Sequence, residues 1–288
     1  MITLDYPRAE RPAAPHRLYS ISDGDTPQIL QPVRMVSTDT PEKAGYAGRS
    51  ELAQPKLDEC RRRLETGFFP EIPAALVEYL VAKLTGDAAA RHIAAGDAAS
   101  LEFDLLLKDR LTRSTGTQRR VATIPTGEVV DRYGRLLAYL APWFAGGSSD
   151  PLPPKHDPNR RTFNLDMVAV GWAAPFLIYP SLPHDDDLNL FLTEARAAWE
   201  HKRGAWQAYG ENLLLGYEYR LCIKLGTAKT PKKGVAAAFQ RICIDVSSDP
   251  PRSVGRFGWA DVAPPDRLWV WTDDAAKASV DLDIPIAP

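Results

Sequence analysis

The chain has 288 residues, of which 44% are hydrophobic and 25% are charged, and its formal net charge is −2. This length permits a substantial hydrophobic core in one large domain, or in one domain with a smaller annex, and the composition is ordinary for a globular protein. The small net charge excludes a global basic field that would gather nucleic acid, so any contact with a polyanion must be local.

The cysteine content and the absence of long apolar runs indicate the cellular compartment in which the protein is expected. The three cysteines, Cys60, Cys222 and Cys243, are an odd number and lack the spacing of metal ligands. This pattern argues against a disulfide framework and favours a reducing compartment. Residues 1–17 contain no long apolar core, and no run in the sequence approaches the length of a membrane span. We therefore expect a soluble, cytoplasmic protein with no membrane partner.

Elements expected in the first part of the chain are a loose arm, short strands and a helical block. Residues 1–15 are rich in proline and charge, which predicts the arm. A strand is expected at 17–21, and the apolar runs Gln28–Leu30 and Val33–Val36 are expected to pair as adjacent strands joined by a turn at Gln31-Pro32. The block at 47–113 is helical, with predicted helices at 56–65, 73–84, 87–96 and 97–113.

Strand signals return after this block. We expect strands at 121–124, 128–130, 136–140 and 176–179, a long exposed loop at 141–161, and helices at 164–171 and 188–204. Residues 207–288 contain further strand-like segments, at 213–225, 239–247, 255–260 and 268–272, and form a β-rich annex or an extension of the first sheet. The predicted fold class is therefore α+β, with a domain at 16–206 interrupted by the helical insertion at 47–113.

Two acidic clusters flank one arginine between residues 22 and 42. The clusters are Asp23-Gly24-Asp25-Thr26 and Asp39-Thr40-Pro41-Glu42, and the arginine is Arg34. If the intervening strands pair, Asp25 faces Asp39, and converging carboxylates repel each other unless a cation lies among them. Calcium accepts an irregular shell of oxygen ligands, so Asp25, Asp39 and the Thr40 carbonyl suit calcium better than magnesium.

The same stretch offers groups for chemistry. Glu42 has no obvious partner and is a candidate to orient and deprotonate a metal-associated water. Arg34 is a candidate to bind an anionic group through two hydrogen bonds. Arg34 and Asp39 are five positions apart, so a bend or bulge must intervene if they share one face. Either cluster alone is typical of an ordinary turn, and that alternative stays open.

Several motifs occur in an order that resembles the staphylococcal-nuclease-like, or thermonuclease-like, family. They are DGDT (23–26), VRMVSTDTPE (33–42) and DRYGR (131–135), followed by the less specific FNLDMVAVGWA (163–173) and TEARAAWEHKRGAW (193–206). The resemblance covers about residues 16–48 and 121–206. It implies a five-stranded OB-fold-like β-barrel with packed helices, and calcium-dependent hydrolysis of DNA and RNA phosphodiesters that leaves 3′-phosphate ends.

The resemblance also implies roles for individual residues. Asp25, Asp39 and the carbonyl of Thr40 match the metal ligands, and Glu42 matches the presumed general base. The remaining matches are the phosphate-neutralising pair Arg34 and Arg135 and the nucleotide-contacting tyrosines Tyr133 and Tyr179. Leu177 stands where a second binding tyrosine is expected, and the chain is slightly acidic where secreted members are strongly basic.

These observations predict a calcium-dependent nuclease that acts on DNA, RNA or both. One alternative is a non-catalytic OB-type module that binds nucleic acid or a protein partner, which the missing tyrosine and the weak net charge favour. Another is a structural calcium site that stabilises the hairpin without hydrolysis. The C-terminal extension is a candidate surface for a protein partner.

Overall fold

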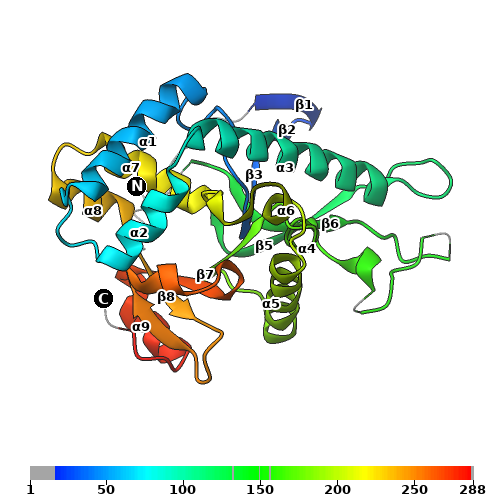
Figure 1. Ribbon diagram of the computed structural model, residues 1–288. Coiled ribbons are helices and arrows are strands. Elements are labelled where there is room, and N and C mark those ends of the chain that lie inside the picture. The colour runs from blue at the N-terminus through cyan, green and yellow to red at the C-terminus, as the bar shows by residue number, and fades with distance from the viewer. Residues whose placement is uncertain (1–16, 132, 149, 156, 287–288) are drawn as a thin grey trace, which may run out of the picture.

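The computed structural model describes residues 17–131, 133–148, 150–155 and 157–286, so the arm predicted at residues 1–15 lies outside the described residues. Helices and strands are mixed, as predicted for an α+β protein (Figure 1). The described strands form three sheets: the hairpin β1-β2, a three-stranded sheet ordered β3-β6-β5, and a five-stranded sheet ordered β4-β7-β10-β8-β9.

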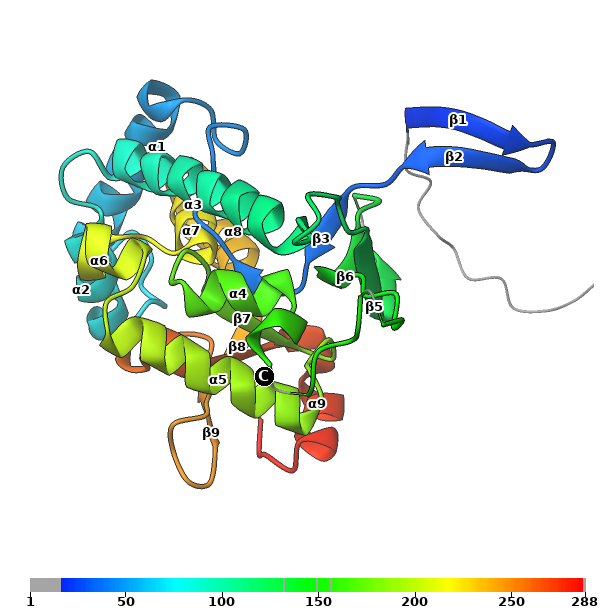
Figure 2. The ribbon, with the colours of Figure 1, turned by 90° about the vertical axis from the view of Figure 1, so that its right-hand side faces the viewer.

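The N-terminal hairpin projects from the body of the molecule (Figure 2). Strands β1 (Arg17–Asp23) and β2 (Thr26–Leu30) pair with each other, and nearly all their residues are exposed. The predicted pairing of β2 with the next strand is wrong, because β3 (Val33–Met35) instead pairs in parallel with β6 (Leu136–Pro142). Gln-Pro does not supply the positive φ angles of a tight hairpin turn, and the Pro32 carbonyl accepts a hydrogen bond from Leu136 N–H at 2.9 Å.

The three-stranded sheet is open at both edges. Strand β5 (Val121–Val130) pairs antiparallel with β6 and merges two predicted strands, with a register shift between Pro125 and Val130. Among the described residues no sheet closes on itself, so the predicted five-stranded barrel is not present in this arrangement.

The five-stranded sheet contains strands from the early and the late parts of the sequence. Its members are β4 (Ser37–Asp39), β7 (Ala174–Tyr179), β10 (Arg267–Trp271), β8 (Arg241–Asp245) and β9 (Arg252–Gly255). Strand β4 pairs with β7, and β7 pairs in parallel with β10. The C-terminal segment thus extends a sheet that begins with residues of the acidic stretch, and this places its side chains near that stretch.

The C-terminal segment is also less β-rich than predicted. Residues 213–225, expected to be a strand, mostly belong to helix α7 (Gly216–Thr227), and further helices are α6 (Ala205–Tyr209), α8 (Pro231–Ala238) and α9 (Ala275–Asp281). Helix α7 is buried on most of its faces. A nearly continuous apolar run of this kind does not distinguish a buried helix from a buried strand.

The predicted helical block is confirmed as α1 (Ser50–Glu65), α2 (Ala74–Lys83) and α3 (Ala88–Leu111). Gly96, expected to end a helix, instead lies within α3. A Cβ atom at this position would lie 2.6 Å from the carbonyl oxygen of Glu42. The glycine therefore permits α3 to cross directly over the acidic stretch, which explains why it is compatible with the helix interior despite its low propensity.

Two further helices share a hydrophobic cluster with α3. Helix α4 (Phe163–Ala169) is capped by Thr162, whose side chain accepts a hydrogen bond from Leu165 N–H, and α5 (Asp185–Glu200) packs against α4. All three cysteines are buried and free. Within the described ranges, none of the helices has the length and apolarity needed to cross a membrane.

Candidate functional site

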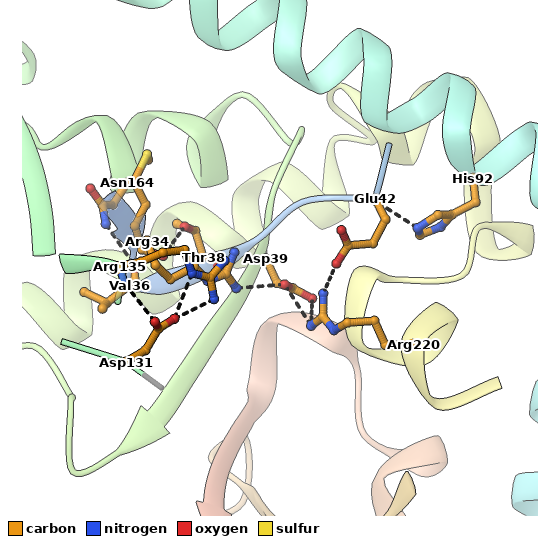
Figure 3. A network of polar contacts seen from close by, with 11 residues as sticks. Arg34, Val36, Thr38, Asp39, Glu42, His92, Asp131, Arg135, Asn164 and Arg220 are labelled. Carbon is orange, nitrogen blue, oxygen red and sulfur yellow. Dashed lines mark hydrogen bonds and ion pairs between the residues drawn. The ribbon is translucent and has the colours of Figure 1, made fainter. Parts of the chain in front are cut away.

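A sharp corner between β3 and β4 brings Arg34 and Asp39 together. Ser37 has a φ of 60° at this corner, and Asn164 Nδ2 donates a hydrogen bond of 2.8 Å to the carbonyl of Val36. The Nη2 atom of Arg34 lies 2.9 Å from Asp39 Oδ1 and 3.2 Å from the Thr38 carbonyl (Figure 3). The predicted bend between Arg34 and Asp39 is thus confirmed, and it changes the sheet to which the chain belongs.

Arg220 of α7 lies between the two carboxylates of this stretch (Figure 3). Its Nη2 atom is 2.9 Å from Asp39 Oδ2 and 3.0 Å from Asp39 Oδ1, and its Nη1 atom forms an ion pair with Glu42. Asp39 is only 1% exposed. A buried carboxylate requires a charged partner, and here two guanidinium groups fill that role.

This geometry determines the direction in which the pKa values of Asp39 and Arg220 are shifted. Burial raises the pKa of Asp39, but the nearby Arg220 and Arg34 outweigh it, so the net pKa of this carboxyl lies below its usual value. Burial alone lowers the pKa of Arg220, and the charges of Asp39 and Glu42 reverse that effect and raise it. Asp39 is therefore ionised at neutral pH and Arg220 is firmly protonated.

His92 of α3 holds the backbone of Glu42. Glu42 N–H donates a hydrogen bond of 2.8 Å to Nε2 of His92, so Nδ1 carries the ring proton and donates it to the Leu214 carbonyl at 2.9 Å. The imidazole is stacked on Tyr219 with ring centroids 3.9 Å apart. Burial lowers the pKa of His92 to about 4, so the ring is neutral and fixes the position of Glu42.

The lowered pKa of His92 predicts a pH dependence of stability. Between the ordinary value of 6.5 and about 4, the unfolded chain binds a proton at His92 that the folded chain does not. The free energy of unfolding therefore falls as the pH is lowered through this window, and the contribution is fully present above 6.5. Urea denaturation at a series of pH values is expected to show a steeper fall for the wild type than for His92→Gln. A variant of the exposed His201, His201→Gln, serves as the matched control and should retain the wild-type slope.

The DRYGR motif lies at the start of β6, beside β3. Arg135 immediately precedes the register pair Val33 and Leu136, and its Nε lies 2.8 Å from Asp131 Oδ2 (Figure 3). The guanidinium of Arg135 also lies over the ring of Tyr133, at 5.4 Å from the centroid, and Tyr133 is 64% exposed. This arrangement places the second predicted arginine and an accessible aromatic ring on the side of Arg34.

Two predicted site residues lie elsewhere. Asp25 is in the turn of the β1-β2 hairpin, at the end of the hairpin distant from β3, where it accepts a hydrogen bond from Thr26 Oγ1 at 3.0 Å. Tyr179 is buried near the C-terminus, where its hydroxyl donates to Asp281 and accepts from Lys277 Nζ at 2.9 Å. Neither residue joins the cluster of Arg34, Asp39 and Glu42 in this arrangement.

The donors present in the cluster do not form a calcium site as they stand. Both oxygens of Asp39 already accept hydrogen bonds from guanidinium groups. The start of α7 covers the same side, since a Cβ on Gly216 would lie 2.5 Å from Asp39 Oδ2 and from the Thr40 carbonyl. No group of three potential metal-ligating side chains occurs in the described part of the chain. Calcium binding by Asp25, Asp39 and Thr40 thus stays a prediction that requires Asp25 to approach and Arg220 to withdraw.

Sequence reasoning missed Arg220 and His92. Arg220 is 178 positions from Glu42, its ion-pair partner, and lies in a segment whose apolar run predicts a strand. No local pattern connects these residues with the acidic stretch. The charge of the acidic stretch is the feature that points to such a partner. Converging carboxylates require a cation nearby, either from the chain or from solution.

Comparison with known proteins adds no relative to this description. No family model and no curated protein matches the chain. The resemblance to the staphylococcal-nuclease-like family therefore rests on the sequence motifs alone.

Proposed function

We propose that the chain is a phosphodiesterase that acts on nucleic acid. The observation that supports this function is the common location of Arg34, Asp39, Glu42 and Arg135 around the junction of β3, β4 and β6. Residues from two distant parts of the sequence, joined by their place in the resemblance, are neighbours in space. A purely structural turn would not need this set.

The chemistry proposed for these residues is in-line hydrolysis. Glu42 takes a proton from a water molecule, and the water oxygen bonds to phosphorus. The bond from phosphorus to the 5′-oxygen breaks with its electron pair on that oxygen, which takes up a proton from solvent, and a 3′-phosphate is left. Negative charge increases on the non-bridging oxygens during this step, and fixed guanidinium groups stabilise it. Arg34 and Arg135 are partly exposed, with 31% and 40% of their side chains accessible, so a phosphate can approach both.

The implied barrel and calcium site belong to the same proposal. Docking of the β1-β2 hairpin against the open β3-β6-β5 sheet would bring five strands together and carry Asp25 toward Asp39. Exposed apolar side chains support this docking because they lie on both partners, at Leu18 and Ile29 of the hairpin and at Val121 and Ile124 of β5.

The second candidate function is a module that binds nucleic acid without cleaving it. It is favoured by Arg220, whose guanidinium engages both Asp39 and Glu42 and so occupies the acceptors that a metal or a water would use. In this case Arg34 and Arg135 bind phosphate, and Glu42 serves only to hold Arg220 in place.

A digestion assay distinguishes the two functions. Purified protein is incubated with single- and double-stranded DNA and with RNA, in calcium chloride or in EGTA, and product ends are identified by mass spectrometry. The nuclease predicts calcium-dependent cleavage with 3′-phosphate ends, and loss of that cleavage in Asp25→Asn. The matched control is Asp23→Asn on the same hairpin, which should digest normally. Binding of these substrates without any cleavage would favour the second function.

A further inference from the structure

Arg241 at the start of β8 is enclosed by aromatic rings, and among the described residues its guanidinium has no hydrogen-bond acceptor. Its guanidinium carbon lies 4.9 Å from the ring centroid of Phe176, 5.5 Å from those of Trp269 and Trp271, and 6.0 Å from that of Tyr217. Within the described residues its guanidinium forms neither a hydrogen bond nor an ion pair with a protein group. Stacking on rings stabilises the cation but leaves its N–H donors unused, and these donors suit a phosphate.

This guanidinium also belongs to the electrostatic surroundings of the candidate site. Burial, followed by repulsion from Arg220, lowers the pKa of Arg241 to about 10, while Asp39 opposes the shift. Arg34 repels it as well. Arg34, Arg220 and Arg241 thus surround the two carboxylates of Asp39 and Glu42, and the net positive charge of this group favours an anion nearby.

An exposed ring and a cavity lie next to Arg241. Trp271, the register partner of Arg241 on β10, is 40% exposed. It lines a cavity of about 590 Å³ whose wall also contains Gln240, Arg256, Asp273 and Asp274. A volume of this order accommodates a small organic ligand, and the mixed donors and acceptors match the edge of a heterocyclic base. Together the ring, the cavity and the cation form the parts of a nucleotide subsite.

We propose that Arg241 and Trp271 form a subsite for single-stranded nucleic acid, in which Arg241 binds a phosphate and Trp271 stacks on an unpaired base that enters the cavity. The subsite extends the proposed phosphodiesterase site along the strand. Only this extension rests on the proposed function, and binding of a single strand at Arg241 and Trp271 does not. A single strand fits because stacking on Trp271 requires a free base face, which a duplex does not offer. DNA and RNA share this chemistry, so both are tested.

Fluorescence anisotropy with a labelled short oligonucleotide tests the subsite. Titrations are performed in EGTA on a Glu42→Gln background, so cleavage does not interfere. Trp271→Ala and Arg241→Met are each expected to raise the Kd for single-stranded DNA or RNA about 10-fold. Arg241→Met should also reduce the slope of log Kd against log salt by about 0.7. A hairpin duplex without overhangs should bind more weakly to the parent and be unaffected by Trp271→Ala.

Matched controls use an exposed tryptophan and an exposed arginine at other places. Trp143 is 55% exposed beyond the end of β6, and Arg252 pairs with Asp245 at the opposite end of β8, so Trp143→Ala and Arg252→Met should bind as the parent does. Trp271 is at the surface, so its variant tests the subsite even if Arg241→Met fails to fold. An unchanged Kd in Trp271→Ala, or an equal loss for the duplex, overturns the proposal.

The outcomes separate the subsite from the catalytic function. If the wild type never cleaves but Trp271→Ala loses affinity, the subsite stands and the phosphodiesterase fails. If the wild type cleaves and both variants bind normally, the subsite fails and the phosphodiesterase stands. Capture of a peptide at the cavity in place of an oligonucleotide would also count against the subsite.

Discussion

Glu42→Gln is expected to reduce phosphodiester hydrolysis by about 10²–10³-fold while the protein remains folded. Glutamine cannot take a proton from water, but it keeps the backbone N–H that donates to His92 and a side-chain oxygen that can accept from Arg220. The geometry around Asp39 should therefore persist in the variant. Initial rates of cleavage of single-stranded DNA, compared at equal concentration of folded protein, measure the effect.

The matched control for this variant is Glu65→Gln. Glu65 lies at the end of α1 in an exposed ion pair with Arg61, remote in the chain from the acidic stretch, and its variant should cleave at the wild-type rate. Arg135→Ala provides an independent check, because it removes a proposed phosphate ligand and should lose a similar factor. Cleavage at the wild-type rate by Glu42→Gln would falsify the assignment of the general base.

Glu218→Ala is expected to lower the free energy of unfolding by about 3–5 kcal/mol. Glu218 is fully buried, and its carboxylate lies 2.8 Å from Lys83 Nζ and 3.0 Å from Arg267 Nη1. It also accepts from the hydroxyl of Tyr79 at 2.6 Å and from Leu215 N–H at 3.0 Å. Alanine leaves two buried cations without their carboxylate, and this desolvation cost is the source of the effect.

Urea denaturation at neutral pH measures the loss. The control is Glu65→Ala, which removes an exposed carboxylate from an i,i+4 pair and should cost less than about 1 kcal/mol. A change of that small size for Glu218→Ala would mean that Lys83 and Arg267 find other partners or lose their charge. The double variant Lys83→Met with Glu218→Met should recover part of the lost stability, because it removes a charge of each sign.

The sequence predicted the local part of the candidate site and missed the part that comes from long-range packing. The five-residue spacing of Arg34 and Asp39 predicts a bend, and the positive φ of Ser37 provides it. The place of Arg135 follows only from the resemblance, and the parallel pairing of β3 with β6 brings the start of β6, where Arg135 lies, next to β3.

The features that the sequence did not predict depend on contacts between segments that are far apart in the chain. A glycine such as Gly96 is typical of a helix end. Here it lies inside α3, where the absence of a side chain allows the helix to pass close to the backbone of Glu42. Helix α7 is buried on most sides, so its apolar run lost the periodicity that identifies a helix. The apolar run of α7 predicts a strand, and a strand there gives no reason to place Arg220 against Asp39. The strand segments at 17–21 and 28–30 are predicted, but their pairing with each other as the β1-β2 hairpin is not.

The corner at Val36 and Ser37 has a mechanical consequence. Strands β3 and β4 are consecutive in the chain but belong to different sheets, so the Arg34 and Asp39 ion pair spans the seam between them. Arg220 of helix α7 forms an ion pair with Asp39 at this junction. Any rocking of one sheet against the other would pull these charges apart, so the contacts that link the two sheets here are the same ones that hold Arg34, Asp39 and Arg220 in alignment.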